Sequence, residues 1–231
     1  MGRARFRFHG DLNDFLHSQR RSVWLDYEFR DRLSLKHAIE TFGVPHPEVG
    51  EPSDLNRPLR DGEEIEVRPR LYPVPPNGQW RFVLDGHLGR LAKYLRILGF
   101  DTLYEAGADD RRLADAAAAG RFLLTRDRSL LMRRAVVHGL LVRHDEPRRQ
   151  LEWLAARLGL WGAAEPLRRC LRCNALLEPV AKEKVWERIP PKTRLWCNEY
   201  MTCTGCGQLY WPGSHYERMQ AWIRALRAKN E

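Results

Sequence analysis

The sequence predicts an α/β protein in three parts, and three observations indicate this arrangement. In the middle of the chain, short apolar runs alternate with amphipathic helical patterns, as in a parallel sheet with helices on both faces. The first 72 residues show strand patterns around one short helix. Near the C-terminus lie two Cys-x-x-Cys pairs, a spacing typical of a zinc ribbon. We expect an α+β domain at 1–72, a linker at 73–79, an α/β domain at 80–164 and a ribbon with a basic C-terminal helix at 165–231.

Strand patterns dominate the N-terminal segment. Residues 3–8 (RARFRF) alternate polar and apolar side chains as a half-buried strand does, and residues 24–29 (WLDYEF) form a second strand candidate. Ser34 opens a short helical pattern that ends at Gly43, and the strand EIEVRPRL follows a Pro-rich loop. This order of strands and helix resembles the β-grasp (ubiquitin-like) fold. We see no catalytic constellation in this segment, and interpret it as a binding or scaffolding module.

The central segment contains four strand–helix units. Strands are expected at RFVLD (81–85), DTLYE (101–105), RFLLT (121–125) and GLLVR (139–143). The helices between them are expected at 88–99, at 111–119 after the cap Asp110, at 129–138, and from Pro147 to about Leu158. In the first helix Arg90, Lys93 and Arg96 lie away from the apolar face, which is formed by Leu88, Leu91, Ala92, Leu95 and Leu98.

Aspartates stand at or just after the ends of all four predicted strands: Asp85 ends the first, and Asp109 with Asp110, Asp127 and Asp145 follow the other three. The carboxyl ends of parallel strands meet at one edge of an open α/β sheet, so these side chains are expected at the same edge. Clustered carboxylates repel one another unless a cation neutralises them, and Mg²⁺ or Mn²⁺ favours such oxygen ligands. One or two metals there would activate water for phosphodiester hydrolysis. The alternative is that the acids are helix caps, for which Asp110 and Asp145 are well placed.

Four cysteines form the second chemical pattern. Their two hooks suit a closed, tetrahedral and structural Zn²⁺ site, with the ligands Cys170, Cys173, Cys203 and Cys206. Cys197 is left over and is expected to be a buried or free thiol, while His215 is a candidate substitute ligand. Ser214 and Glu217 form a capping box that opens a basic helix to about Lys229.

The stretches RFVLDGHLGRLAKYLRILGFD and RFLLTRDRSLLMRR, followed by RCLRCNALLEPV and CTGCGQLYWPGSHYERM, resemble the Mut-seven C-terminal ribonuclease family. This family is a branch of the PIN-like nucleases, and the resemblance covers roughly residues 80–219. Some members carry an N-terminal ubiquitin-like domain. The resemblance implies a PIN-like fold that binds Mg²⁺ or Mn²⁺ through three or four acids and cuts RNA. Carried over by motif, these acids are Asp85, Asp110 and Asp127, with Asp109 as neighbour of the middle acid and Asp145 as a fourth.

The charge distribution favours a polyanionic partner for the later part of the chain. The net charge is +9, and residues 1–79 carry 12 basic and 13 acidic side chains, whereas residues 80–231 carry 27 and 17. RNA, such as tRNA, rRNA or the ribosome, is the expected partner. The candidate contacts are Arg90, Arg126, Arg128, Trp211 and His215, although Trp211 could instead pack the ribbon.

A metal-dependent ribonuclease is therefore the preferred function, and two rivals stay open. One is a noncatalytic RNA- or ribosome-binding zinc-ribbon protein, and the other is an adaptor that binds a protein through its β-grasp domain. A haloacid-dehalogenase-like phosphatase would need a second Asp where His87 stands, and no GK[ST] phosphate loop is present. The sequence shows neither an apolar run of about 18 residues nor an N-terminal signal region. We expect a cytoplasmic protein with no membrane partner.

Overall fold

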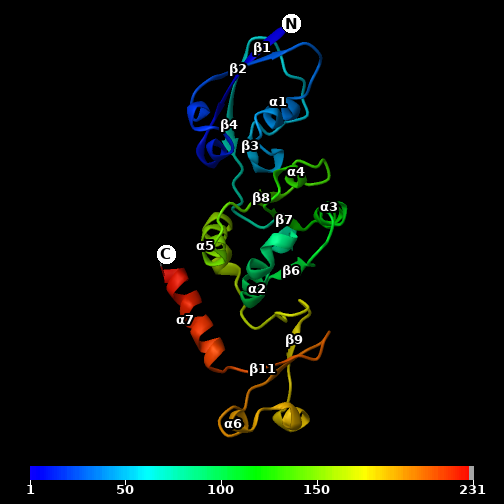
Figure 1. The fold of residues 1–231 in the computed structure, drawn as a ribbon, viewed down its shortest axis with the longest axis vertical. Coiled ribbons are helices and arrows are strands. Elements are labelled where there is room, and N and C mark those ends of the chain that lie inside the picture. Colours follow the sequence, from blue (N-terminus) through cyan, green and yellow to red (C-terminus); the bar gives the residue numbers. More distant parts are fainter. Residues whose placement is uncertain (229–231) are drawn as a thin grey trace. The chain divides into compact units, whose positions relative to one another are not determined.

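The computed structural model describes residues 1–228, apart from the side chains of His215, Met219 and Ala228 (Figure 1). The chain divides into two compact units. The first contains Met1–Gln79, Val83–His87 and Glu105–Arg143, and the second contains Trp80–Phe82, Leu88–Tyr104 and the chain from His144 onward. No helix among the described residues combines the length and the apolar character needed to cross a bilayer.

The N-terminal part of the first unit is a four-stranded mixed sheet with one helix. The strands are β1 (Gly2–Phe8), β2 (Leu25–Phe29), β3 (Val49–Glu51) and β4 (Glu63–Pro69), in the order β2-β1-β4-β3. β1 is antiparallel to β2 and parallel to β4, and β3 is antiparallel to β4. Helix α1 (Leu35–Thr41) follows the predicted cap Ser34, whose Oγ accepts from the backbone N–H of His37 at 3.2 Å. Short 3-10 helices lie at Gly10–Phe15, Ser18–Arg20 and His46–Glu48.

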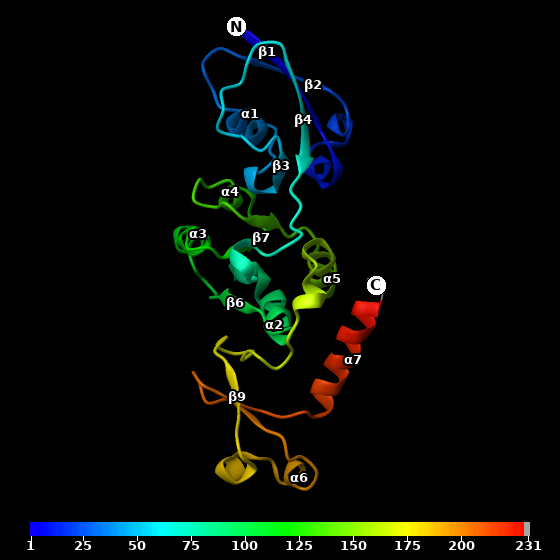
Figure 2. The ribbon, with the colours of Figure 1, turned by 180° about the vertical axis from the view of Figure 1, so that it is seen from behind.

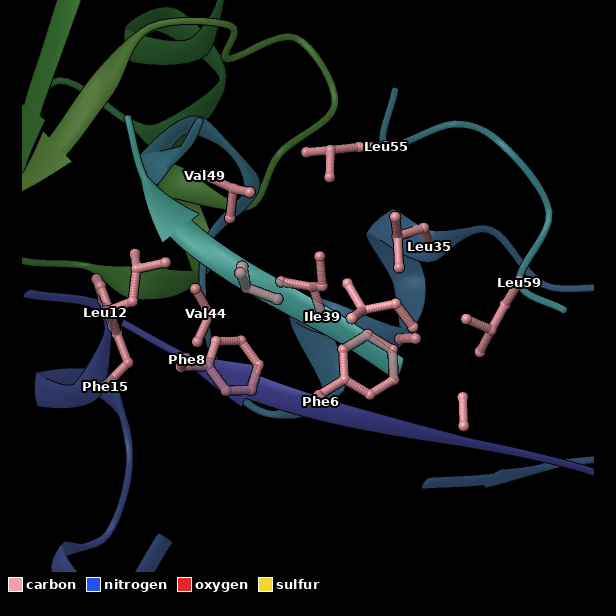
Figure 3. Close-up of a cluster of buried hydrophobic side chains, with 14 of the residues drawn as sticks. Phe6, Phe8, Leu12, Phe15, Leu35, Ile39, Val44, Val49, Leu55 and Leu59 are labelled. Carbon is pink, nitrogen blue, oxygen red and sulfur yellow. The ribbon is translucent and has the colours of Figure 1, made fainter. Parts of the chain in front are cut away.

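One buried cluster holds this sheet and helix together (Figure 3). The alternation of RARFRF puts Phe6 and Phe8 of β1 on one face of the sheet, where α1 supplies Leu35 and Ile39. All four side chains are fully buried. Alternate residues of β1 and one face of α1 therefore share a single core. Leu141, from a strand much later in the chain, also packs against the cluster.

The alternation of strands and helices predicts a second sheet, and its strand order is β6-β5-β7-β8. Its strands are β5 (Arg81–Leu84), β6 (Asp101–Tyr104), β7 (Phe122–Thr125) and β8 (Gly139–Leu141). β7 and β8 are parallel, with Leu123 opposite Gly139 and Thr125 opposite Leu141. The prediction of an α/β protein with a parallel sheet and flanking helices is confirmed.

Two helices of the first unit accompany β7 and β8. Helix α3 (Asp110–Ala118) ends before Gly120, and helix α4 (Arg128–Leu131) follows β7 directly. The predicted ten-residue helix at 129–138 is wrong, because α4 has only four residues. The chain turns after Met132, so that the β-branched Val136 is fully buried in a cluster with Leu123, Leu130 and Leu131.

The second unit contains the other helices of the sheet and the cysteine-rich segment (Figure 2). Helix α2 (Gly89–Ile97) and its two caps, Leu88 and Leu98, bury the predicted leucines, and helix α5 (Pro147–Leu158) has the predicted bounds. The ribbon is an antiparallel sheet in the order β11-β10-β9, formed by β9 (Leu177–Pro179), β10 (Met201–Cys203) and β11 (Leu209–Tyr210). Helices α6 (Pro191–Arg194) and α7 (Ser214–Ala228) complete it, and Lys229 lies outside the described residues. Further 3-10 helices lie at Pro76–Gly78, Gly86–Leu88, Leu160–Ala163 and Lys182–Arg188.

Candidate active site and four-cysteine centre

Asp85 is a buried carboxylate at the end of β5. Its side chain is only 6% exposed. Oδ2 accepts hydrogen bonds from the Thr125 hydroxyl and from the backbone N–H of Arg126, both at 2.6 Å, and Oδ1 accepts from the backbone N–H of His87 at 2.9 Å. These bonds join the ends of β5 and β7, so the carboxylate has one fixed orientation.

Asp127 is linked to Asp85 through Thr125. The backbone N–H of Asp127 donates to Thr125 Oγ1 at 2.9 Å, and Thr125 itself is fully buried. The exposed carboxylate caps α4, since its Oδ1 accepts from the backbone N–H and the hydroxyl of Ser129, both at 2.7 Å, and from the N–H of Leu130 at 3.3 Å. The Ser129 hydroxyl is the main cause that lowers the pKa of Asp127, and backbone N–H groups and Arg133 lower it further. Asp127 is therefore ionised at neutral pH.

Asp109 and Asp110, the acids between β6 and α3, have roles that differ from those predicted. The prediction that Asp110 caps α3 is wrong: Asp109 is the N-cap, and its Oδ1 accepts from the N–H of Arg112 at 2.8 Å. Asp110 is the first residue of the helix, and its Oδ2 lies 3.0 Å from Nη2 of Arg133. The sequence alone does not tell which of two adjacent aspartates is the N-cap, because either one has the side chain that a cap requires. Arg133, which faces Asp110 and also lowers the pKa of Asp127, was not predicted.

Asp145 precedes α5 in the second unit. It is exposed, and the predicted cap role belongs to its neighbour Glu146, whose carboxylate accepts from the backbone N–H groups of Arg148 and Arg149 at 3.0 Å. The prediction of an Asp145 cap is thus wrong by one residue. Glutamate reaches these amides because Pro147 fixes the first turn of the helix after it.

The acids fit a hydrated cation better than a cage of protein ligands. Among the described residues, the group of three or more His, Cys, Asp or Glu side chains whose ligand atoms come together is the set of four cysteines, and it contains none of the predicted aspartates. Asp127 accepts its three bonds on Oδ1, and Oδ1 of Asp85 accepts one. Acceptor capacity therefore remains on both carboxylates, and Mg²⁺ needs only one or two carboxylates because it retains several waters.

The predicted RNA contacts have different environments. Arg90 and Arg126 are exposed. The guanidinium of Arg128 lies 5.3 Å from the centre of the Phe15 ring, so this side chain contacts the N-terminal domain. Trp211 is half-buried against a cluster that includes Tyr200 and Leu209, as expected if it packs the ribbon. The side chain of His215 lies outside the described residues. The RNA-binding roles of these residues stay predictions.

The four predicted cysteines come together as potential metal ligands. Their Sγ atoms all lie within 4.8 Å of one another. The pair from Cys170 and Cys206 is 3.7 Å apart, and the pair from Cys173 and Cys203 is 3.3 Å apart. A zinc tetrahedron with Zn–S bonds of about 2.3 Å has edges of about 3.8 Å, so the arrangement fits a structural zinc ion. Cys197 is buried elsewhere, in the cluster with Tyr200, as predicted.

The thiols also show why this group favours a cation. Burial acts to raise the pKa of Cys170, but hydrogen bonds from the Tyr210 hydroxyl and from backbone N–H groups outweigh it and lower that pKa to about 6. A backbone N–H lowers the pKa of Cys173, yet burial and the neighbouring thiols together raise it to about 12. One thiolate thus suppresses ionisation of the next, and a bound cation removes this repulsion.

Arg96 connects the first cysteine hook to α2, and sequence reasoning missed it. Expected on the polar side of the helix, it is only 5% exposed. Nε and Nη2 donate to the carbonyl of Thr102 at 3.1 and 3.0 Å, and Nη1 donates to the carbonyls of Leu171 and Arg172 at 3.1 and 3.2 Å. Burial lowers its pKa, while the thiols of the hook act in the opposite direction. The position of Arg96 between Leu95 and Ile97, both buried, was the available signal.

Glu48 is a second buried charge that the sequence did not reveal. It is 2% exposed and accepts from the N–H of Leu141 in β8 at 2.8 Å, beside Arg143 at 3.8 Å. The guanidinium of Arg143 lies 4.3 Å from the centre of the Phe15 ring and 2.6 Å from Asp14. Since β8 is an edge strand, the N-terminal domain supplies a partner for backbone that would otherwise lack one.

Comparison with known families agrees with the resemblance seen in the sequence. The model described as Mut7-C RNAse domain matches residues 80–223, which is more than half of the chain, and the model described as Mut7-C ubiquitin matches residues 1–74. Searches of curated proteins and of solved structures gave no match. The chain therefore belongs to the Mut7-C RNAse domain family and carries its ubiquitin-like N-terminal domain, a membership that points to a nuclease-like function.

Proposed function

We propose that the protein is a metal-dependent ribonuclease that hydrolyses RNA phosphodiester bonds beside Asp85 and Asp127. The single observation that carries this proposal is the Thr125 hydroxyl, which donates to the carboxylate of Asp85 and accepts from the backbone of Asp127. It holds the ends of two strands in one hydrogen-bonded unit. The family supplies the substrate class, because an RNAse domain implies RNA.

Each residue around this hydrogen-bonded group has a separate role. Asp85 and Asp127 would hold Mg²⁺ or Mn²⁺. Asp110 is the third predicted ligand, and it would have to give up its ion pair with Arg133 to bind the cation. Such a cation would supply Lewis-acid stabilisation of the phosphoryl oxygens and lower the pKa of water. Thr125 and the N–H of Arg126 fix the orientation of Asp85, and Ser129 keeps Asp127 ionised. Arg133 is a cation near the acids that a substrate phosphate could attract.

The cysteine centre has a structural task in this proposal. Zn²⁺ held by four thiolates has no open position for water, so it stabilises the ribbon and takes no part in hydrolysis. The small ribbon clusters around Cys170, Leu177 and Cys203 and around Val185 and Ile189 are too limited to hold this segment alone. Metal binding and folding of the ribbon are therefore coupled.

The test is cleavage of a labelled single-stranded RNA by purified full-length variants in Mg²⁺ or Mn²⁺. Asp85→Asn and Asp127→Asn should each lower the rate at least about 100-fold, because each removes a charge that the cation requires. Asp115→Asn, an exposed aspartate of α3, is the matched control and should cleave at the wild-type rate. Full activity in either site variant would overturn the assignment.

A noncatalytic RNA-binding protein is the second candidate, and one observation favours it. Asp109 and Asp127 both act as helix N-caps, which is a sufficient structural reason for an aspartate at either position. Under this alternative, millimolar Mn²⁺ does not bind to the acids, no RNA is cut, and RNA affinity falls steeply with salt. Metal titration combined with a cleavage assay separates the two candidates.

A further inference from the structure

The segment between β9 and β10 is a folded insertion in the ribbon. This ribbon insertion (residues 180–200) contains the 3-10 helix Lys182–Arg188 and α6, drawn in yellow and orange in Figures 1 and 2. Its inner side has its own core, to which Val185, Ile189, Cys197 and Tyr200 contribute. The segment is therefore an ordered structure with a defined inside and outside.

The outside of the insertion exposes three large apolar side chains. Trp186 is 43% exposed, Leu195 is 87% exposed and Trp196 is 55% exposed. The guanidinium of Arg194 lies 4.7 Å from the centre of the Trp186 ring, and Leu195 and Trp196 directly follow Arg194 in the chain. A single exposed apolar residue is ordinary, but a group of this size on one small segment marks a binding surface.

Hydrogen bonds fix the orientation of this surface. Nε of Arg194 donates to the carbonyl of Ile189 at 2.9 Å, which holds the guanidinium over Trp186. Lys182 Nζ donates to the carbonyl of Arg194 at 2.7 Å and to Asn198 Oδ1 at 2.8 Å, and it lies 5.9 Å from the centre of the Trp186 ring. The indole is therefore positioned before any ligand arrives, which reduces the entropy lost on binding.

Charge and shape favour a single-stranded nucleic acid over a protein. The insertion carries five basic residues (Lys182, Lys184, Arg188, Lys192 and Arg194) against three glutamates. Protein interfaces are depleted in lysine at their centres, whereas single-strand binding sites combine cations with flat aromatic rings. Unpaired bases stack on such rings, and the basic side chains follow the phosphates.

We propose that the ribbon insertion is a stacking platform for single-stranded RNA, with bases on Trp186 and Trp196 and phosphates near Lys184, Lys192 and Arg194. The choice of RNA rests on the proposed function of the chain. The platform shares no residue with the acids Asp85 and Asp127, so it concerns how the substrate is held rather than how it is cut. Neither tryptophan was among the RNA contacts expected from the sequence.

The experiment measures binding of a fluorescein-labelled single-stranded 20-mer RNA to the zinc-loaded full chain, without added Mg²⁺ or Mn²⁺. Replacing both tryptophans, Trp186→Ala with Trp196→Ala, should weaken binding about 5- to 100-fold, since each stacked base contributes substantially. Trp24→Ala is the matched control, because Trp24 also carries an arginine over its ring, that of Arg5, but lies in the N-terminal domain. The variant with phenylalanine at both sites should retain most of the affinity.

Three outcomes would overturn the inference. The first is an alanine variant that binds RNA as the wild type does while its zinc content and thermal melting are unchanged. The second is an equal loss of affinity for a 20-base-pair duplex, since paired bases offer no free face for stacking. The third is unchanged RNA binding together with lost binding to vesicles of anionic phospholipid, which would assign the surface to a membrane.

This binding assay, combined with the cleavage assay in Mg²⁺ or Mn²⁺, separates this inference from the proposed function. RNA binding that depends on Trp186 and Trp196 without any cleavage supports the platform and rejects the ribonuclease. Cleavage by a variant whose RNA binding is unchanged supports the ribonuclease and rejects the platform.

Discussion

The hydroxyl of Thr125 lies 2.6 Å from Oδ2 of Asp85, and this hydrogen bond joins two residues that are 40 positions apart in the chain. Both residues are buried, and the same hydroxyl accepts from the backbone N–H of Asp127. Thr125 was expected only as the last residue of a strand. Its position makes it the link between the two aspartates of the proposed active site, and we treat it as a positioning residue.

Replacing Thr125 with valine tests this link. Valine has the same shape but no hydroxyl, so the N–H of Asp127 and one acceptor site of Asp85 lose their partner. We expect the free energy of unfolding to fall by about 1–3 kcal/mol, measured by urea denaturation. For RNA cleavage, kcat should fall by a larger factor than KM changes, because the carboxylate of Asp85 loses its fixed orientation. Thr125→Ser keeps the hydroxyl and should stay close to wild type; equal losses in the two variants would contradict the link.

Removing the Ser129 hydroxyl should change how Asp127 titrates. Because this hydroxyl is the main cause of the lowered pKa, Ser129→Ala should raise the pKa of Asp127 toward its ordinary value, as followed by carboxyl ¹³C NMR. A lowered pKa in the folded state contributes stability that is present above the pKa of the unfolded chain and lost as pH falls through the folded one. In Ser129→Ala this contribution shrinks, and the loss on acidification occurs at higher pH. An unchanged pKa would contradict the assignment of its cause.

The bond between Glu48 and β8 predicts a scaffolding role for the N-terminal domain. Glu48→Ala leaves the N–H of Leu141 without its carboxylate partner inside the protein, so we expect a loss of about 1–3 kcal/mol in unfolding free energy. Glu48→Gln retains an oxygen acceptor and should lose less. Amide hydrogen exchange at Leu141 reports the effect locally. Faster exchange in the alanine variant is the expected result, and unchanged exchange would remove Glu48 from this role.

Metal removal should affect the ribbon selectively. A chelator, or Cys203→Ser, should remove the proposed Zn²⁺, which would allow the four neighbouring thiols to ionise together. We expect faster amide exchange in the ribbon strands β9 to β11 and unchanged exchange in β1 and β4, which depend on a hydrophobic core. Zinc content measured alongside gives the stoichiometry. Cys197→Ser is the control, because Cys197 is outside the four-cysteine group, and it should keep its metal.

The elements with strong periodicity were predictable from the sequence, and those set by tertiary contacts were not. β1 alternates cleanly and α2 has a continuous apolar face, so each buries the expected residues. β3 has only three residues within a Pro-rich loop and gains its pairing from β4. Helix α4 is short because Val136 is buried in the core. Helical propensity is a local property and does not predict this burial.

The candidate sites show the same division. The cysteine spacing alone predicted four ligands that the fold brings together, since each hook is a local structure. The aspartates were expected at strand ends, but helix capping and ion pairing decide which oxygens stay available, and both depend on neighbours such as Ser129 and Arg133. The burial of Glu48 was not foreseeable, because its partner, the N–H of Leu141, lies 93 positions away in the sequence. Arg96 had a local signal, but its bonds to Leu171 and Arg172 span 75 and 76 positions and could not be predicted.

The most direct test of the central claim is the rate of RNA cleavage as a function of Mn²⁺ concentration, measured with wild-type protein and with Asp85→Asn. The account expects a rate that rises and saturates at millimolar Mn²⁺ in the wild type, and no Mn²⁺-dependent cleavage in the variant. The same Mn²⁺ dependence in both proteins, or cleavage that does not depend on Mn²⁺ or Mg²⁺ at all, would contradict it.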